Sequence, residues 1–441
     1  MMVGIGVEAA EHVGQWTVFW HFSAINCHSF STATKHPGHR VLIHIEDIMT
    51  LLTTKRRTTQ FALLAGILLI AANLRAPVTG LPPVLSLVRA DFDLSTTAAG
   101  ALTALPLLAF AILSPFSALF AREYGLERAL FGAMLTVALG IALRSSGASW
   151  ALYVGTWVTG MGIAVGNVLL PSLVKREFPH NIPAVTGAFA LAMGVVAALA
   201  SAAVVPLASA WGWKAALMAF LVLPLAALLV WLPQLAARTK PAPDTTTPPH
   251  GGKVWHAALA WQVTLYLGLN STIYYVVIGW LPTILTDMGL SPEQAGSLHG
   301  ALQLSTAVPG LLLGPLLRRL HDQRLAAATV AALSGVALIG LQLAPAYALM
   351  WAVLFGVGAG AHFMLGLAFI GLRSRTASQA ASLSGMAQCI GYLLAAVGPL
   401  AMGFLHDALG GWQIPLGICA ALALLAAFVG TLAGRNTQMG A

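Results

Sequence analysis

The stretch LSTTAAG at residues 94–100 recurs as LSPEQAG at residues 290–296, which lie 196 residues farther along the chain. A single short match carries little weight unless other matches share its spacing. The same shift of 196 residues relates three further pairs: Arg122 and Arg318, Gly160 and Gly356, and Gly162 and Gly358. A Gly-Trp pair at 212–213 also recurs at 411–412. The sequence therefore predicts a chain built from two repeated halves.

The composition predicts what these halves are. Of the 441 residues, 58% are hydrophobic and 8% are charged, and the mean hydropathy is +0.83. Soluble domains carry about 25% charged residues, so this balance excludes an ordinary soluble protein. Apolar segments of about 20 residues recur, each long enough to cross a bilayer as a helix. We expect an all-α membrane protein with twelve transmembrane helices in two six-helix repeats, at 59–85, 95–120, 128–146, 150–174, 184–209, 212–233, 257–286, 293–317, 325–343, 346–371, 378–405 and 412–433.

The repeat and the apolar segments together divide the chain into parts. The expected parts are an N-terminal extension at 1–58, a six-helix half at 59–233, a linker at 234–256, a second six-helix half at 257–433 and a tail at 434–441. The linker region is polar and contains four prolines, which is typical of a flexible connection.

The extension differs from the rest of the chain. It contains six histidines and no sustained apolar run, and Met49 is followed by a short polar and basic lead-in to the first span. We therefore interpret residues 1–48 as disordered or as a translation-start artefact. The histidines are irregularly spaced and the chain has only three scattered cysteines, so we expect neither a metal site nor a disulfide framework.

The basic residues predict an orientation. A net charge of +8 could suggest nucleic acid, but the positions of the charges favour the positive-inside rule instead. If Lys55 is cytoplasmic, sixteen Lys and Arg residues fall on its side, against Arg89, Arg144 and Lys214 on the other. Both ends of the helix bundle are therefore expected in the cytoplasm, and no nucleic-acid partner is expected.

Arg75 is the only charged residue deep inside a predicted span, and no Asp or Glu in another span is placed to neutralise it. An Arg near the bilayer midplane costs roughly 2.5 to 3.5 kcal/mol, so such residues usually face a cavity. Pro77, Pro82 and Pro83 follow it and predict a break in the helix. An unpaired cation beside a break suits a small anionic or strongly polar solute. Asn73 lies on another face of the same segment but is included in the predicted site.

Other polar residues inside the spans complete the predicted site. Gln262, Tyr266 and Asn270 recur every four residues and form one polar stripe, which should face the central cavity or a neighbouring helix. His362 and His299 are the only ionisable groups in their spans and could carry a proton during transport. Gln388 is a single amide that either meets the solute or joins two helices.

Several longer motifs are similar to one family. They are NLRAP at 73–77, GIAVGNVLLP at 162–171 with KREFP at 175–179, GAHF at 360–363 with IGLRSRT at 370–376, and SGMAQ at 384–388 with GYLL at 391–394. With the two-half layout, they resemble the cyanate and 2-nitroimidazole permease family of the major facilitator superfamily. The resemblance implies a solute site near the midplane between the halves, a solute such as cyanate or a nitroimidazole-like compound, and a bacterial inner membrane.

One loop departs from the superfamily pattern. The loop between spans 2 and 3 usually carries an Asp followed by Arg residues, whereas here Arg122, Glu123 and Arg128 frame a loop without an Asp. These residues either form a gating contact or are a solvated topology signal.

The sequence as a whole predicts a secondary active transporter that imports a small anionic or polar solute by alternating access. It contains no nucleotide-binding motif, so we expect no cofactor and energy from a gradient. A drug exporter of the same superfamily is an alternative, although such pumps are expected to offer a buried carboxylate. An intramembrane enzyme would need converging catalytic groups that the spans lack, and a non-transporting sensor is a third alternative. The expected state is a monomer surrounded by membrane lipid.

Overall fold

The computed structural model describes residues 61–179, 181–236, 251–310, 322–375 and 377–439, and every regular element in them is helical. The contacts described below all lie within one compact unit, Lys55–Ala441. The extension predicted at 1–58 and residues 237–250 of the predicted linker fall outside the described residues.

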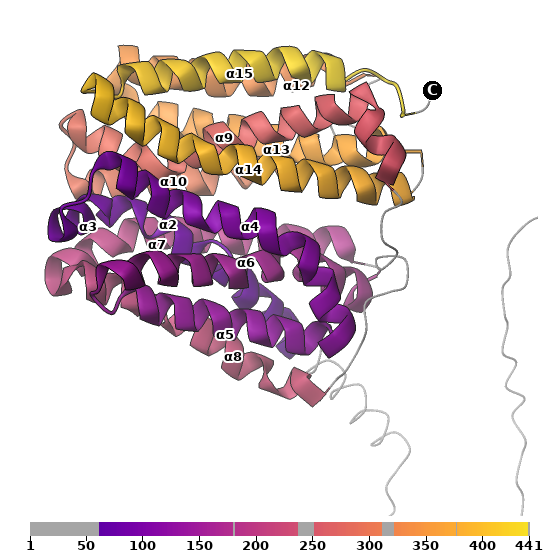
Figure 1. The fold of residues 1–441 in the computed structure, drawn as a ribbon, viewed down its shortest axis with the longest axis horizontal. Coiled ribbons are helices and arrows are strands. Elements are labelled where there is room, and N and C mark those ends of the chain that lie inside the picture. The colour runs from indigo at the N-terminus through magenta and orange to yellow at the C-terminus, as the bar shows by residue number, and fades with distance from the viewer. Residues whose placement is uncertain (1–60, 180, 237–250, 311–321, 376, 440–441) are drawn as a thin grey trace, which may run out of the picture. The chain divides into compact units, whose positions relative to one another are not determined.

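The first half begins with a helix at residues 61–73 and continues with short elements, α2 (Ala76–Thr79), η1 (Pro82–Val84) and α3 (Leu85–Phe92). It then contains α4 (Thr96–Tyr124), α5 (Leu126–Arg144), α6 (Ser149–Glu177), α7 (Ile182–Ala219), α8 (Val222–Trp231) and η2 (Leu232–Ala236). The second half contains η4 (Gly251–His256), α9 (Ala258–Asp287), α10 (Pro292–Ser305), α12 (Arg324–Leu343), η5 (Pro345–Tyr347), α13 (Ala348–Leu372), α14 (Ala377–Leu409) and α15 (Gln413–Ala433) (Figure 1).

Ten helical stretches in the described residues are long and apolar enough to cross a membrane. One of them, Ala184–Leu235, has 52 residues, which is enough for two crossings. It bends at Gly212, whose φ of 78° and ψ of 158° are not helical, so the boundary predicted between spans 5 and 6 is a kink and not a loop. The span predicted at 293–317 begins as α10, and the rest of it extends beyond the described residues.

The two repeated stretches of sequence begin equivalent helices. Ser95 caps α4, where its hydroxyl accepts a hydrogen bond from the Ala98 N–H at 3.1 Å. Ser291 caps α10 in a capping box, in which its hydroxyl accepts from Gln294 N–H and the Gln294 side chain accepts from Ser291 N–H. Such caps satisfy backbone donors that a helix start leaves unpaired. The repeat therefore marks the same structural position in each half.

Each half also holds an arginine against the start of a helix. Arg176 forms an ion pair of 2.6 Å with the buried Glu127. In the second half Arg373 donates to the Gln323 side chain at 2.6 Å and to the Ala433 carbonyl at 2.9 Å. Glu127 and Gln323 are 196 residues apart, so the repeat extends to this contact with a carboxylate in one half and an amide in the other.

The most extensive contacts between the halves are those of α4 with α14 and of α7 with α10, and glycines allow these backbones to approach closely. A Cβ atom placed on Gly100 would lie 2.7 Å from the Pro399 carbonyl oxygen, and one on Gly300 would lie 2.8 Å from that of Ala198. Gly296 and Gly403 are equally close to the backbone across each pair. We call these four glycines the seam. It lies where α4 and α10 begin, the end that the charge pattern predicts to face away from the cytoplasm.

Candidate functional site

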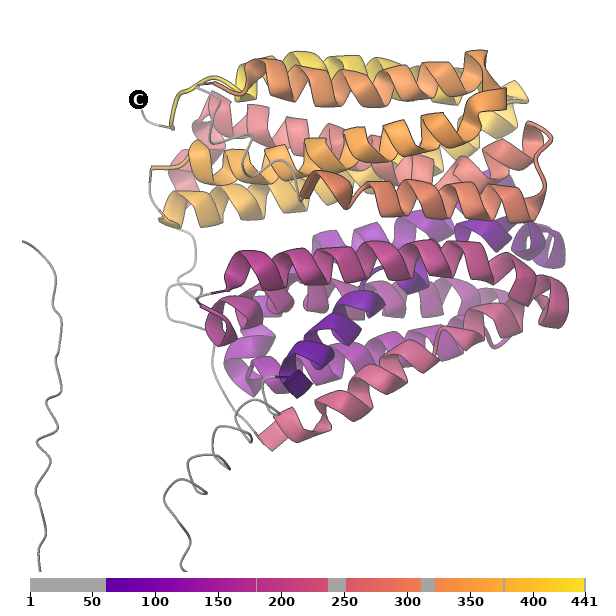
Figure 2. The ribbon, with the colours of Figure 1, turned by 180° about the vertical axis from the view of Figure 1, so that it is seen from behind.

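The first span is broken at Arg75. The helix at 61–73 ends before it, and α2 starts directly after it with Pro77 in its first turn. The N–H groups of Val78 and Thr79 both donate to the Arg75 carbonyl at 3.0 Å, which starts the new turn. Figure 2 shows the first helix, in dark indigo, running obliquely past its neighbours. The break predicted from the prolines is confirmed, and it holds Arg75 between the halves.

The partners of Arg75 come from the other half of the chain. Its Nη1 donates to the Tyr274 hydroxyl on α9 and, at 3.2 Å, to the Gln303 Oε1 on α10. The Tyr274 hydroxyl itself donates to the same Gln303 oxygen at 2.8 Å. These three side chains form a triangle of hydrogen bonds across the boundary between the halves. Gln303 is fully buried and Arg75 is half-buried.

The hydrogen bonds continue from Gln303 back to the first half. The Gln303 amide nitrogen lies 3.5 Å from His299 Nε2, and His299 Nδ1 lies 2.9 Å from the Ser201 hydroxyl on α7. That hydroxyl donates to the Thr79 carbonyl at 3.1 Å. A His299 tautomer with its proton on Nδ1 satisfies all three bonds at once. The network thus begins and ends on the broken segment that contains Arg75. It crosses the boundary between the halves twice, at Arg75 and between His299 and Ser201.

Aromatic rings surround the guanidinium. Its Cζ lies 5.3 Å from the centroid of the Tyr274 ring, within the range of a cation–π interaction. The Tyr275 ring contacts that of Tyr274 edge to face at 5.3 Å, and Tyr392 on α14 contacts Phe110 on α4 in the same way at 5.3 Å. Tyr275 and Tyr392 also lie in the neighbourhood of Arg75. A flat solute bound to Arg75 would therefore meet ring faces and edges.

The Arg75 charge has no counter-ion among the residues that the structure describes, since every ion pair found there joins other residues. Both hydrogen bonds of its side chain within that part of the chain come from Nη1. Its Nε and Nη2 groups thus have no protein acceptor there. They form two neighbouring donors of the fork that a planar group with two oxygens can accept from.

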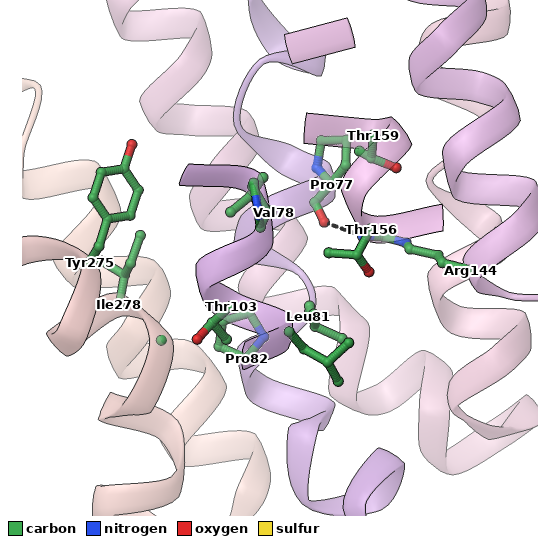
Figure 3. A pocket seen from close by; sticks show the side chains of 13 residues that line it. Pro77, Val78, Leu81, Pro82, Thr103, Arg144, Thr156, Thr159, Tyr275 and Ile278 are labelled. Atoms are coloured by element: carbon green, nitrogen blue, oxygen red, sulfur yellow. Dashed lines mark hydrogen bonds between the residues drawn. The ribbon is translucent and has the colours of Figure 1, made fainter. Parts of the chain in front are cut away.

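A small pocket with a cavity volume of about 20 Å³, room for about one water molecule, lies beside the broken segment. Its lining includes Pro77 and Val78, three threonines from α4 and α6, and Tyr275 from α9 (Figure 3). It also includes Arg144, the last residue of α5, which the sequence analysis counted among the three basic residues on the side away from the cytoplasm. The structure instead buries Arg144 to 1% exposure and directs Nη1 to the Pro77 carbonyl at 2.6 Å. Arg144 ends its helix, so the expectation that Arg75 is the only charged residue deep inside a span is not contradicted, but the burial of Arg144 was not predicted.

Other predicted site residues lie apart from this network. Tyr266 is fully buried, its hydroxyl donates to the Ala327 carbonyl on α12 at 3.1 Å, and its ring lies 3.9 Å from that of His362. His362 Nε2 lies 3.0 Å from the Tyr266 carbonyl. In the described part of the chain, no hydrogen bond joins this pair to Arg75. At Tyr266 the stripe therefore faces neighbouring helices, which was one of the two predicted outcomes.

The remaining predicted polar residues are scattered. Asn270 is buried and Gln262 half-buried, and neither makes a side-chain hydrogen bond to the described residues. Asn73 is buried and donates to the Leu69 carbonyl at 2.8 Å, while its Oδ1 has no partner among those residues. Gln388 is exposed and donates to Ser384 of its own helix at 3.1 Å. Their roles as solute contacts stay predictions.

The residues predicted as a gate lie at the end of α4 and the start of α5, and they are at the surface. Arg122, Glu123 and Arg128 are exposed. Glu127, one position before Arg128, is the buried acid, and it pairs with Arg176. The carboxylate contact near this turn is therefore made by Glu127, in the first turn of α5, and not by Glu123. As for metals, no group of three or more His, Cys, Asp or Glu in the described ranges could hold an ion.

Repeated halves that cross the membrane and share a polar network at their boundary define a membrane transport protein. The Major Facilitator Superfamily pattern matches residues 63–396. The chain is 51% identical over 392 residues to the 2-nitroimidazole transporter of Escherichia coli K12, covering 89% of this chain and 100% of that one. It is 28% identical over 354 residues to the cyanate transport protein CynX of the same organism, covering 79% and 91%.

The solved structures agree on the fold. A bacterial homologue of the human lysosomal transporter Spinster superposes with a TM-score of 0.68 at 16% identity, over 86% of this chain and 97% of the other. The chain belongs to the major facilitator superfamily. It is therefore a multi-pass membrane transporter and not an enzyme, and the predicted resemblance and fold class are confirmed.

Proposed function

We propose that this protein is a secondary active transporter that imports a small anionic or strongly polar planar solute, such as cyanate or a nitroimidazole-like compound. The observation that carries the proposal is the Arg75 guanidinium, which has two donors without a protein acceptor in the described residues and no ion-pair partner there. A nitro or carboxylate group presents two oxygens in one plane, which matches those donors. The relatives named for 2-nitroimidazole and cyanate support this solute class.

The network explains how binding could be linked to movement. Tyr274 and Gln303 bring Arg75 of one half into contact with α9 and α10 of the other. A solute that accepts from Arg75 competes with these contacts, and rocking of the halves around a midplane site is how such folds alternate access. Of the two histidines, His299 is the better candidate for proton coupling, because it belongs to this network and His362 does not.

We further propose that the protein acts as a monomer in a bacterial inner membrane, with both ends of the bundle in the cytoplasm. The sixteen-to-three distribution of basic residues supports the orientation. The division into an extension, two halves, a linker and a tail stays a proposal at its predicted boundaries. The exporter and sensor alternatives have no specific observation in their favour.

The test is uptake of 2-nitroimidazole and of cyanate into proteoliposomes, with the pH inside and outside set independently. Arg75→Gln should reduce uptake about a hundredfold or more, because two charge-assisted hydrogen bonds contribute roughly 1.5 to 3 kcal/mol each. Arg435→Gln, which removes the same charge from the exposed tail, is the control and should transport normally.

Two results would contradict the proposal. Unchanged uptake by Arg75→Gln would make the arginine structural. Absence of uptake of either solute, together with export of lipophilic cations, would favour the exporter. His299→Gln should abolish the response to a pH gradient if protons are coupled through the network.

A further inference from the structure

A tryptophan and an aspartate are joined at the same end of each half. In the first half the Trp213 Nε1 donates to the Asp91 Oδ2 at 3.2 Å, and in the second half the Trp412 Nε1 donates to the Asp287 Oδ2 at 2.7 Å. The two aspartates are 196 residues apart, which is the spacing of the repeat, and each tryptophan belongs to the repeated Gly-Trp pair. We call each contact a Trp–Asp clasp. Both clasps lie at the end of the bundle that the charge pattern predicts to face away from the cytoplasm.

A basic side chain adjoins each clasp, but its chemistry differs between the halves. In the first half the Lys214 Nζ lies 3.1 Å from the aspartate Oδ2 and 5.4 Å from the centroid of the tryptophan ring. In the second half the centroid of the His406 ring lies 4.3 Å from that of the tryptophan ring, and its Nε2 lies 4.0 Å from the aspartate Oδ2. Lysine stays charged at physiological pH, whereas histidine gains and loses its proton between about pH 5 and pH 8. The repeat thus places a permanent cation beside one clasp and a titratable group beside the other.

Neither nitrogen of the His406 ring has a hydrogen-bond partner among the residues that the structure describes. Nδ1 is buried and lies 3.8 Å from the Asp407 Oδ1, while Nε2 faces Asp287. A neutral imidazole has one N–H donor, whereas the protonated ring has two, one for each of these carboxylates. Side-chain movements of about 1 Å would turn both distances into charge-assisted hydrogen bonds. The side chain is 22% exposed, so a proton from water can reach the ring.

The charged groups that face His406 are both acidic. Asp287 ends α9, and Asp407 follows His406 on α14. Of the other elements that pack against α14, α13 and α15 contain no Lys, Arg, Asp or Glu, and the charged residues of α4 and η4 lie at the opposite end of the bundle. In the described ranges no Lys or Arg forms an ion pair with either aspartate. His406 is therefore the side chain placed to balance their charges.

We propose that His406 is a proton-binding site, in which the protonated ring bridges Asp287 and Asp407 at the end of the bundle away from the cytoplasm. Two carboxylates and the face of the Trp412 ring stabilise the charged form, and the neutral ring balances neither carboxylate. The clasp of the second half is thus strengthened at low pH and weakened at high pH, while that of the first half keeps its lysine and does not respond. Asp407 also accepts from Thr97 of the first half, so the site adjoins a contact between the halves.

The test is fluorine nuclear magnetic resonance of the full-length protein in detergent, with fluorinated tryptophan incorporated throughout. Trp412→Phe and Trp213→Phe assign the two signals of interest. Between about pH 8 and pH 5 the Trp412 signal should move, because the ring against it becomes charged. The Trp213 signal should stay in place, since Lys214 beside it is charged over the whole range, and it serves as the internal control.

Two matched variants separate His406 from other titrating groups. His406→Gln is never charged and His406→Lys always is, so the Trp412 signal should stop responding to pH in both. Asp407→Asn should weaken proton binding roughly two- to fivefold, which is the effect of one partly exposed ion pair. A Trp412 signal that does not move in the wild type, or that moves equally in His406→Gln, would overturn the proposal, and an unchanged midpoint in Asp407→Asn would contradict the bridge. The inference goes beyond the proposed function, and no step of this test depends on transport.

Discussion

Replacing Gly100 with alanine should push the two halves apart at the seam. The added Cβ atom would lie 2.7 Å from the Pro399 carbonyl oxygen and 3.1 Å from the Leu400 Cα, whereas ordinary contacts begin at 3.4 Å. Both neighbours are backbone atoms, so no side chain can rotate out of the way. To restore normal contact from 2.7 to 3.4 Å, α4 and α14 must separate by about 0.7 Å.

The cost of this overlap falls on the conformation in which the seam is closed. Overpacking of a well-packed contact costs roughly 1 to 3 kcal/mol. A conformation with the seam open has no such overlap, so the whole cost appears as a shift of the equilibrium between the two states. That shift corresponds to about 5- to 150-fold in favour of the open seam.

Spin labels can measure this shift. Ala90 on α3 and Leu409 on α14 are exposed and belong to different halves, so cysteines there can carry a label pair after the three native cysteines are replaced. Pulsed electron resonance should show a larger share of long distances in Gly100→Ala than in the parent. Gly417→Ala, where the Cβ meets nothing within 4 Å, should leave the distances unchanged. Identical distances in a folded Gly100→Ala protein would refute the assignment of the seam as a moving contact.

Three other changes have defined outcomes. The Asp407 carboxylate accepts hydrogen bonds from the N–H and the hydroxyl of Thr97 at the start of α4, both at 2.8 Å. Asp407→Asn should weaken this contact between the halves by roughly 1 kcal/mol. The open-seam population should then rise several-fold in the same spin-label experiment. Tyr266→Phe should lower thermal stability without changing solute affinity, whereas Tyr274→Phe should change affinity in a binding assay. Equal effects of the two would contradict the separation of the core from the site. Ser291→Ala should cost roughly 1 kcal/mol through its capping box, visible as a lower melting temperature in detergent, and an unchanged value would show that the cap contributes nothing.

The fold was predictable because it depends on local patterns that repeat. The stretches at 94–100 and 290–296 contain the capping serines of equivalent helices, and long apolar segments leave the chain few options but to span the membrane. The boundary at Gly212 was less visible, because a single residue with positive φ redirects the chain there without a polar loop to mark it.

The site was predictable only where one residue carried the signal alone. A lone arginine before Pro77 stands out in the sequence, because a charged side chain inside a span has a high free-energy cost in the bilayer. Its partners do not, because Tyr274 and Gln303 are 199 and 228 residues away and many polar residues in the spans could have filled their place. Arg144 was missed because an arginine at the end of a span is usually a topology signal, and its burial depends on the Pro77 carbonyl 67 residues earlier in the chain.

The seam has a consequence for how fast the protein can work. At each of the four glycines the nearest atom across the contact is a backbone carbonyl oxygen. Such backbone contacts can open and close without a change of side-chain rotamers. Glycine has no side chain, so the glycines themselves contribute no charge that would lose its partner when the contact opens. Opening and closing this contact should therefore add little to the energy barrier for reorientation. We expect the exchange of hydrogen bonds around Arg75 to set that barrier.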